Sequence, residues 1–138
     1  MKDFPVKPGY VEIPHPADIS IAVTAVSLES VFSESLIAMQ ELAGVKILED
    51  GTQSEQFSIS GMSNEILLVT FLNEVNFMRE NGFWPTFTKI EIKGPLLKCS
   101  YLKAKCEKSG YEIKAVTFSE MKIKNRGEYW YTKIVFDV

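Results

Sequence analysis

The hydrophobic residues of this chain follow two repeats, one with a period of two and one with a period of three to four. Alternation over residues 18–24 predicts a β-strand with one buried face. Residues 10–13 predict a short extended segment before it, because Pro14 and Pro16 prevent a longer strand. Residues 1–10 contain prolines and a glycine, which predict an irregular N-terminal arm.

Two stretches have helical spacing. Apolar residues recur every three or four positions over residues 28–42, where Ser27 is the expected N-cap and Gly44 the expected end. A second stretch of this kind begins after Ser63 and ends at residues 81–82. Both patterns predict amphipathic helices whose apolar stripes belong to the core.

Beyond residue 44, short segments of extended character alternate with turns that contain glycine. The predicted strands cover residues 45–48, 56–60, 87–93, 96–106, 112–116, 120–124 and 128–136. The last of them is apolar on both faces and is therefore expected to lie at the centre of its sheet. The pattern as a whole predicts an α+β fold, in which two amphipathic helices pack on a largely antiparallel β-sheet.

The composition is that of an ordinary globular protein. Of 138 residues, 46% are hydrophobic and 24% are charged, which argues against disorder and predicts one domain over residues 1–138. The formal net charge of −3 argues against a nonspecific nucleic-acid binder, which needs a basic excess. The apolar clusters are too short to span a membrane, and the N-terminus lacks the apolar core of a signal peptide. We therefore expect a soluble, cytoplasmic protein.

Cysteine and histidine give little support to covalent or zinc chemistry. Cys99 and Cys106 are seven residues apart, in or beside one predicted strand, so the geometry is poor for a disulfide between them. His15 is the only histidine, and no cysteine–histidine cluster could hold zinc. Two thiols in a reducing compartment are the simplest interpretation.

Tyr129, Trp130 and Tyr131 form a row of aromatic residues in the last predicted strand. Aromatic side chains of this kind can stack on the bases of single-stranded nucleic acids. No clear basic groove is interleaved with them in the sequence, so core packing is the favoured interpretation.

Carboxylates stand at the beginning and at the end of the strand pattern. Asp18 precedes the first main strand, where it is either a turn residue or an oxygen ligand of a cation. Asp137 and Val138 follow the last strand and place a side-chain carboxylate next to the chain end. If folding brings these ends together, the oxygens suit a hard divalent cation, and Lys114 could offset part of their charge. Glu74, at the edge of the second helix's apolar stripe, either faces water or projects into a polar pocket.

Four segments of this chain resemble motifs of the archease family. HPADISI at residues 15–21 resembles H-T-A-D-I-G-I, and EIKAVTF at residues 112–118 resembles E-I-K-A-V-T-Y. The segment at residues 71–74 is similar to W-L-N-E, and residues 135–138 resemble the family's hydrophobic-Asp-Val end.

The resemblance implies a protein cofactor of an RtcB-type RNA ligase, which joins tRNA halves. Archeases promote guanylylation of the ligase and allow repeated turnover, and they are not known as ligases themselves, so no residue is expected to be catalytic. The matching positions imply a metal site formed by Asp18, Asp137 and Val138. Lys114 and Glu74 would line the same functional pocket, and His15 would flank it. Calcium is the expected cation, with magnesium or manganese as alternatives, and no direct nucleic-acid or membrane binding is expected.

The chain departs from the family motifs at several positions. Pro16 and Ser20 replace threonine and glycine, and Phe118 and Ser119 replace tyrosine and histidine. Phe71 stands where the family commonly has tryptophan. A role that relatives assign to the missing hydroxyl or imidazole therefore cannot be transferred, whereas both acidic positions are retained.

Two other functions remain open from the residues. Paired carboxylates could serve a metal-dependent phosphoester hydrolase, although no nucleophile constellation is evident. A plain RNA-binding adaptor would bind RNA with a steep salt dependence. The net negative charge of the chain argues against this function.

Overall fold

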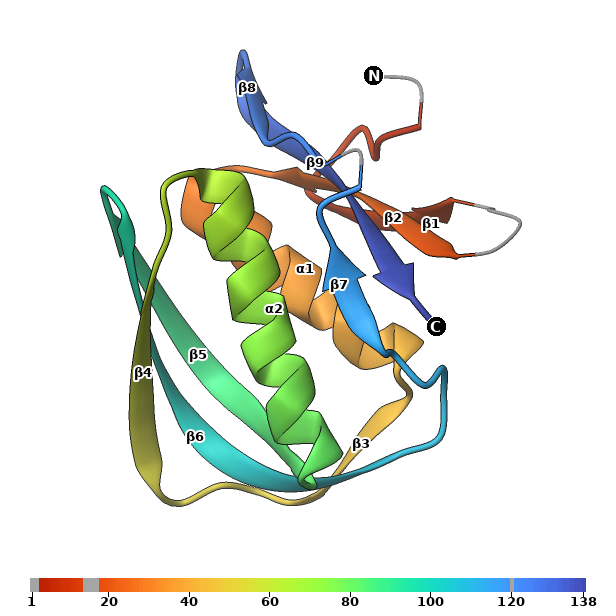
Figure 1. Ribbon diagram of the computed structural model, residues 1–138, viewed down its shortest axis with the longest axis vertical. Helices are drawn as coiled ribbons and strands as arrows, with labels where there is room; N and C mark the ends of the chain where they lie inside the picture. The colour runs from red at the N-terminus through yellow and green to blue at the C-terminus, as the bar shows by residue number, and fades with distance from the viewer. Residues whose placement is uncertain (1–2, 14–17, 120) are drawn as a thin grey trace.

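The computed structural model describes residues 3–13, 18–119 and 121–138, in which two helices lie between two antiparallel sheets (Figure 1). The first sheet has the order β1 (Gly9–Ile13), β2 (Ile19–Ala25), β9 (Tyr129–Asp137) and β7 (Ala115–Thr117), and β8 (Lys124–Arg126) also pairs with β9. In the second sheet, β6 (Leu96–Lys108) pairs with β3 (Val45–Glu49), β4 (Ser54–Ser60) and β5 (Phe83–Lys93). The α+β prediction is confirmed, with two sheets in place of one.

Both predicted helices are present and begin at the predicted caps. In α1 (Leu28–Leu42), the Ser30 N–H donates to Ser27 Oγ at 3.1 Å. In α2 (Asn64–Glu80), Ser63 Oγ accepts from the third residue that follows it, also at 3.1 Å. Each hydroxyl satisfies an N–H that the first helical turn leaves without a partner.

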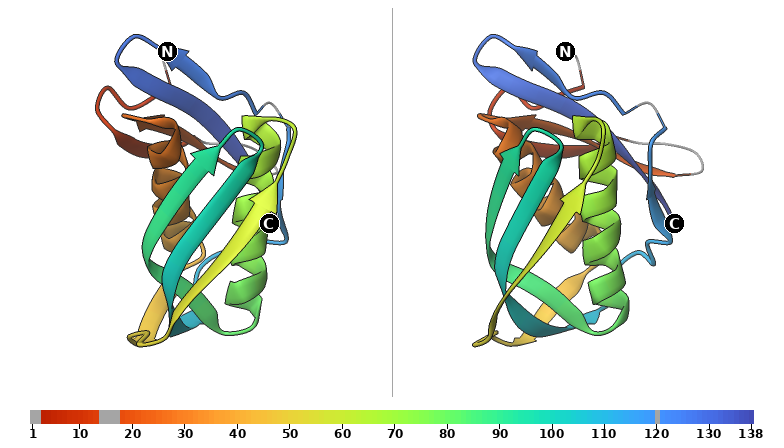
Figure 2. Two further views of the ribbon diagram at one scale, coloured as in Figure 1. Left: turned by 90° about the vertical axis from the view of Figure 1, so that its left-hand side faces the viewer. Right: turned by 60° about the vertical axis from the view of Figure 1, so that its left-hand side comes forward.

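One hydrophobic cluster joins the helices to both sheets. Figure 2 shows β4, β5 and β6 lying over the two helices. Phe32 of α1 and Phe71 of α2 meet in the cluster with ring centroids 5.7 Å apart. The first sheet contributes Ile21 and Phe136, and the second contributes Leu97, all fully buried. The aromatic position 71 therefore belongs to the core.

Strand β9 lies inside its sheet, as its two apolar faces predicted. It pairs with β2 along one side and with β7 and β8 along the other. Thr132, Ile134 and Phe136 are buried toward the helices. A strand in this position connects the N-terminal part of the fold to its C-terminal end.

Strand β5 begins earlier than the sequence predicted. It starts at Phe83 instead of residue 87 and includes Pro85. Proline is tolerated because β5 pairs only with β6 among the described strands and so forms a sheet edge. A bulge between Thr86 and Lys89 follows, where Phe87 has a φ of 50° and is 82% exposed.

Two other predicted strands are shorter than expected. The segment predicted at 112–116 forms only β7, at residues 115–117, and the segment predicted at 120–124 contributes only β8, at residues 124–126. Met121 is buried without belonging to a strand. The alternation around it therefore reflects packing of a loop on the core.

The two cysteines are buried, and neither forms a disulfide. Burial raises the pKa of the Cys99 thiol to about 11, which disfavours its reactive thiolate form. In the described residues, no helix is long and apolar enough to cross a membrane.

The C-terminal end of α1 is closed by a distant segment of the chain. Three successive N–H groups donate to carbonyls at the end of the helix and just beyond it: Ser109 to Gly44 O at 3.2 Å, Gly110 to Ala43 O at 3.1 Å, and Tyr111 to Leu42 O at 2.9 Å. These bonds satisfy carbonyls that a helix end leaves unpaired, and they fix the start of the segment that leads to β7.

The close contact at this cap predicts that Gly110→Ala destabilises the protein. An added Cβ would lie 2.6 Å from the Gly44 nitrogen and would also press on the α1 carbonyl of Leu42. We expect a loss of about 1–3 kcal/mol in the free energy of unfolding, measured by urea denaturation. Ser109→Ala is the control, because that hydroxyl is exposed and makes only a 3.4 Å bond. Equal stability of Gly110→Ala and the unmodified protein would contradict the packing described.

Candidate functional site

Strand register brings the two carboxylate positions together. The β2–β9 ladder ends at the pair Ile19 and Phe136. The next residue on each strand is Asp18 and Asp137, so continuing the register by one step places them opposite each other. Figure 1 shows the end of β9 beside the start of β2. Asp18 is half-buried and Asp137 is exposed.

The third element at this point is β7, which carries the Lys114 motif. Ala115 pairs with Asp137, and the Lys114 N–H donates to the Asp137 carbonyl at 2.7 Å. The Lys114 side chain is exposed. Val138, the residue after Asp137, is partly buried against the core, and these contacts hold the end of the chain in place. We call Asp18, Asp137, Val138 and the Lys114 main chain the acidic tip.

Asn73 of α2 holds β7 in place. Its Nδ2 donates to the Val116 carbonyl at 3.1 Å, and its Oδ1 accepts from the Val116 N–H at 2.9 Å. The side-chain amide thus pairs with both main-chain groups of one residue, as a neighbouring strand would. Because Val116 lies two residues after Lys114, this pair also supports the acidic tip.

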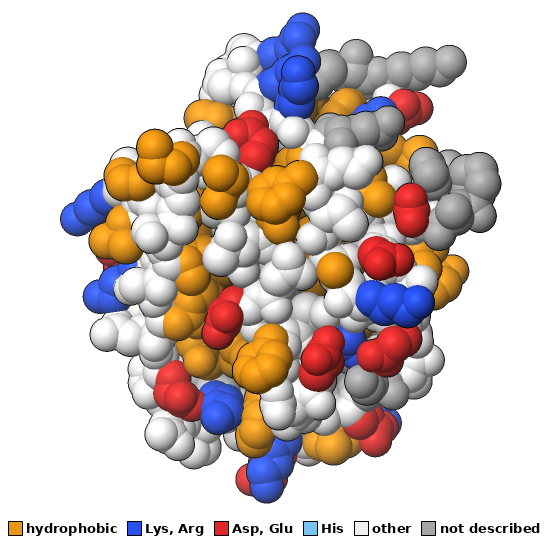
Figure 3. Space-filling view, viewed as in Figure 1, with side chains coloured by type: hydrophobic (Ala, Val, Ile, Leu, Met, Phe, Trp, Pro, Cys, Tyr) orange, Lys and Arg blue, Asp and Glu red, His pale blue; other side chains and the backbone are white. Residues whose placement is uncertain are grey.

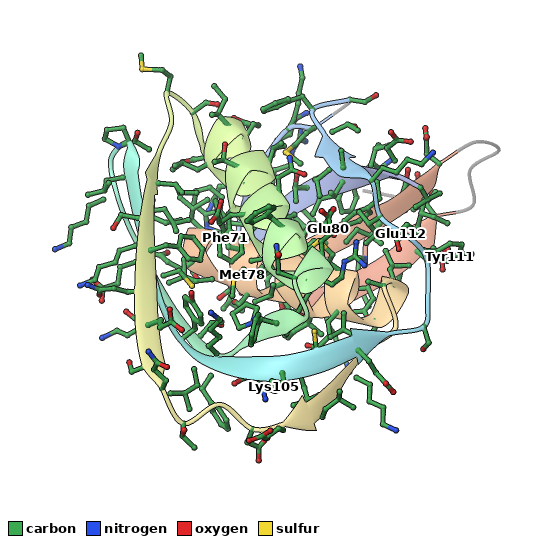
Figure 4. All side chains as sticks on the ribbon, turned by 60° about the horizontal axis from the view of Figure 1, so that its bottom comes forward. Phe71, Met78, Glu80, Lys105, Tyr111 and Glu112 are labelled. Carbon is green, nitrogen blue, oxygen red and sulfur yellow. The ribbon has the colours of Figure 1, made fainter. Side chains whose placement is uncertain are left out.

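Further along α2, polar residues bind the segment that precedes β7. Asn76 Nδ2 and Arg79 Nη2 donate to the Ile113 carbonyl at 3.0 and 3.1 Å. Arg79 Nε donates to Asn76 Oδ1 at 2.8 Å, and Arg79 Nη2 lies 3.7 Å from Glu112 Oε1. Figure 4 shows Glu112 and Glu80 on the other side of α2 from Met78. The chain of polar contacts therefore fixes residues 112–116 along the helix.

These positioning residues were not predicted from the sequence. Asn73 and Asn76 interrupt a very apolar helix, and Arg79 follows three residues later. Positions three apart share one face of a helix, so this spacing is a polar stripe that points to a bound segment. The polar stripe is visible in the sequence, but its role becomes clear only when the segment that it binds, residues 112–116, is known.

Glu74 lines a groove beside α2. It is exposed, and six other residues line the groove: Phe77, Met78, Asn81, Phe83, Tyr101 and Lys103. Burial raises the pKa of Tyr101, and the charges of Glu55, Cys99 and Glu74 raise it further. None of Asp18, Lys114 and Asp137 lines this groove, and the assignment of Glu74 to a common functional pocket stays a prediction. His15 lies outside the described residues.

The oxygen donors of the acidic tip fit a hard cation only in part. In residues 3–13, 18–119 and 121–138, no three Asp, Glu, His or Cys side chains are grouped to share a metal. Two carboxylates remain, with main-chain oxygens beside them. Calcium and magnesium accept this type of donor and take water for the rest of their coordination, whereas zinc prefers nitrogen and sulfur.

Comparisons with known proteins agree on one family. Residues 10–138 match the sequence model of the Archease protein family. The chain is 30% identical over 136 residues to the protein archease of Thermoplasma acidophilum, covering 94% of each chain. It is 27% identical to the Thermotoga maritima protein over 127 residues, which are 91% of this chain and 96% of that one.

Solved structures give the same result for the fold. A crystal structure from Thermotoga maritima, described as an archease and possible chaperone, matches with a TM-score of 0.71 and 27% identity. The match covers 91% of this chain and 94% of that one. The solution structure of a Methanobacterium thermoautotrophicum protein matches with a TM-score of 0.72 at 22% identity, over 94% and 99% of the two chains, and shows the fold alone.

The double contact between Asn73 and Val116 generates a prediction for the acidic tip. We expect Asn73→Ala to cost about 1–3 kcal/mol of stability, because it removes the partner of two part-buried main-chain groups. It should also speed amide hydrogen exchange at Lys114 and Val116, because β7 loosens from the helix. Asn125→Ala, at an exposed position of β8, should leave both exchange rates unchanged. Unchanged exchange in Asn73→Ala would mean that the helix does not hold β7.

Proposed function

We propose that this chain, which belongs to the archease family, acts as a protein cofactor of an RtcB-type RNA ligase. In this role it raises guanylylation of the ligase and permits repeated turnover in tRNA splicing or RNA repair. Archeases are in general non-catalytic cofactors, and we assign no catalytic residue to this chain. The description of the Thermotoga maritima relative as a possible chaperone agrees with a role exerted on another protein.

The observation that supports the proposal is the end of the β2–β9 ladder at Ile19 and Phe136, beyond which Asp18 and Asp137 are the next residues on the two strands. Carboxylates on neighbouring positions repel each other unless a cation or a proton is shared. Asp18, Asp137 and an oxygen of Val138 are therefore the groups that would hold a divalent cation, with calcium as our first choice and magnesium or manganese as alternatives. Such a cation supplies positive charge that phosphate oxygens can contact.

The residues around the tip would hold it in one geometry while it contacts the ligase. Phe136 is fully buried just before Asp137, and the Asp137 carbonyl accepts from Lys114. A tip with few degrees of freedom loses little entropy when it binds, so more of its binding energy can orient the nucleotide site of the ligase.

The exposed Lys114 amine is a second charge for this contact. Nucleotidyl transfer moves negative charge between phosphate oxygens, and a lysine can stabilise such charge without coordinating it. We therefore assign Lys114 to phosphate contact and the two aspartates to cation binding. His15, in the same motif as Asp18, would flank them.

The decisive measurement is guanylylation of the partner ligase with GTP and manganese. Addition of this protein should raise the fraction of guanylylated ligase, followed with radiolabelled GTP. Asp18→Asn and Asp137→Asn should each reduce the stimulation at least about tenfold, because each variant loses one negatively charged oxygen ligand of the cation. Asp50→Asn, which removes an exposed acid in a distant turn, is the matched control.

Two results would contradict the proposal. One is full stimulation by both aspartate variants while their thermal unfolding remains normal. The other is hydrolysis of a phosphoester by this protein alone that a chelator abolishes, because that result would favour the metal-dependent hydrolase.

A further inference from the structure

A hairpin of the first sheet extends beyond its neighbours. Strand β8 pairs only with the beginning of β9, and the two are joined by a turn at Gly127, where φ is 65°. All residues from Lys124 to Glu128 are exposed. Figure 1 shows β8 projecting at the end of the molecule that is opposite to the acidic tip along β9.

The register of this hairpin interleaves basic and aromatic residues. Lys124 pairs with Tyr131, and Arg126 pairs with Tyr129. Residues that pair directly in an antiparallel ladder project from the same face, and residues two apart on one strand do so as well. The four side chains therefore share one face, which we call the ribbon face.

The ribbon face looks away from the helices. On β9, Thr132 and Ile134 are buried toward the core, so Tyr129, Tyr131 and Lys133 point to the opposite side. The two tyrosines are only half-buried. This arrangement is not evident from the sequence, because the basic residues precede the turn and the aromatic residues follow it.

Aromatic contacts fix the orientation of the rings. Tyr129 and Tyr131 meet edge to face, with centroids 6.5 Å apart and an interplanar angle of 88°. Phe4 of the N-terminal arm meets Tyr131 at 5.4 Å and 79°, and Lys133 Nζ lies 5.6 Å from the Phe4 centroid. The rings are thus held in place before any ligand arrives.

Charge at this end differs from the charge of the whole protein. The chain carries a net −3, yet residues 122–126 contain Lys122, Lys124 and Arg126 and no acid. Lys133 is paired with Asp3 at 3.2 Å, and Glu128 occupies the turn. Figure 3 shows basic side chains at the projecting end of the molecule.

We propose that the ribbon face binds single-stranded nucleic acid. Bases stack on Tyr129 and Tyr131, while Lys124 and Arg126 contact the phosphates that flank them. Preformed aromatic surfaces next to cations are what such binding needs, because every base has a flat face and every linkage carries a negative charge. An acidic peptide would use the cations but would leave the aromatic faces without a matching partner.

The proposal does not rest on the ligase cofactor role. Tyr129 and Asp137 stand at opposite ends of β9, about 27 Å apart for a strand that rises about 3.4 Å per residue. Substitutions in the ribbon face therefore leave the acidic tip untouched, and each site can fail without the other.

Binding is tested by fluorescence anisotropy with a fluorescein-labelled 12-nucleotide RNA over a series of salt concentrations. The double variant Lys124→Gln with Arg126→Gln should bind at least about tenfold more weakly at low salt. Its slope of log affinity against log salt should also fall by about 1.4, since each phosphate contact to a single strand contributes about 0.7. Tyr129→Leu should weaken binding about fivefold or more without changing that slope.

The matched control is Lys89→Gln with Lys98→Gln, which removes the same charge from exposed positions of the second sheet. Its affinity should stay within about twofold of the unmodified protein. The proposal is overturned if no saturable binding occurs at low salt, or if the control loses as much affinity as the ribbon variant. It is also overturned if Tyr129→Leu binds the RNA with normal affinity. Displacement of the labelled RNA by polyglutamate at the same concentration as by unlabelled RNA would overturn it too, because the site would then bind acidic protein segments.

Discussion

The antiparallel pairing of β2 with β9 is the interaction on which the rest of the structure depends. It joins residues more than a hundred positions apart, from Ile19 with Phe136 to Ala25 with Trp130. The pairing is specified by burial, because a slip of one residue would turn Ile21, Ile134 and their neighbours from the core to the outer face. The same register makes Asp18 and Asp137 the next residues at one end of β9, whereas at the other end a separate pairing with β8 sets the ribbon face.

Buried polar groups of α2 position the segment that leads into β7, in addition to the hydrophobic packing of the core. Strand β7 has only three residues, and a strand so short gains little from its own ladder. The amide of Asn73 supplies a second set of main-chain partners, and the Arg79 guanidinium reaches the preceding carbonyl of Ile113 from a fully buried position. A buried polar group without a partner raises the free energy of the folded protein by more than a formed hydrogen bond lowers it. Placements of the segment that leave these groups unpaired are therefore disfavoured. They select one placement for residues 112–116.

Local signals in the sequence predicted much of this fold. Ser27 and Ser63 cap their helices as expected, because capping depends only on residues within one turn. The two apolar faces of the last strand likewise indicated its burial. The alternation over residues 18–24 correctly predicted a strand, but its expected single buried face is wrong, because β2 is buried on both faces from Ser20 to Ala25. The division into two sheets was not predictable in this way, because no local pattern states which strands pair.

The candidate sites also depend on strand pairing that local patterns in the sequence do not specify. The carboxylates Asp18 and Asp137 could be named from their positions at strand ends, but their meeting depends on long-range register. The role of Asn73 could not be predicted, since its partner Val116 lies 43 positions away. The tyrosines of the ribbon face were interpreted as core for a related reason. Their basic neighbours are close in the ladder, yet a turn separates them along the chain.

The irregular start of β5 also protects the molecule from unwanted association. An open strand edge is a template on which another chain can add a strand and begin to aggregate. In β5, Pro85 offers no N–H to any neighbour, and the bulge at Phe87 interrupts the register after Thr86. A strand arriving from a second copy would find no long uninterrupted row of main-chain groups. The strained Phe87 therefore makes the β5 edge of the second sheet a poor template for another chain.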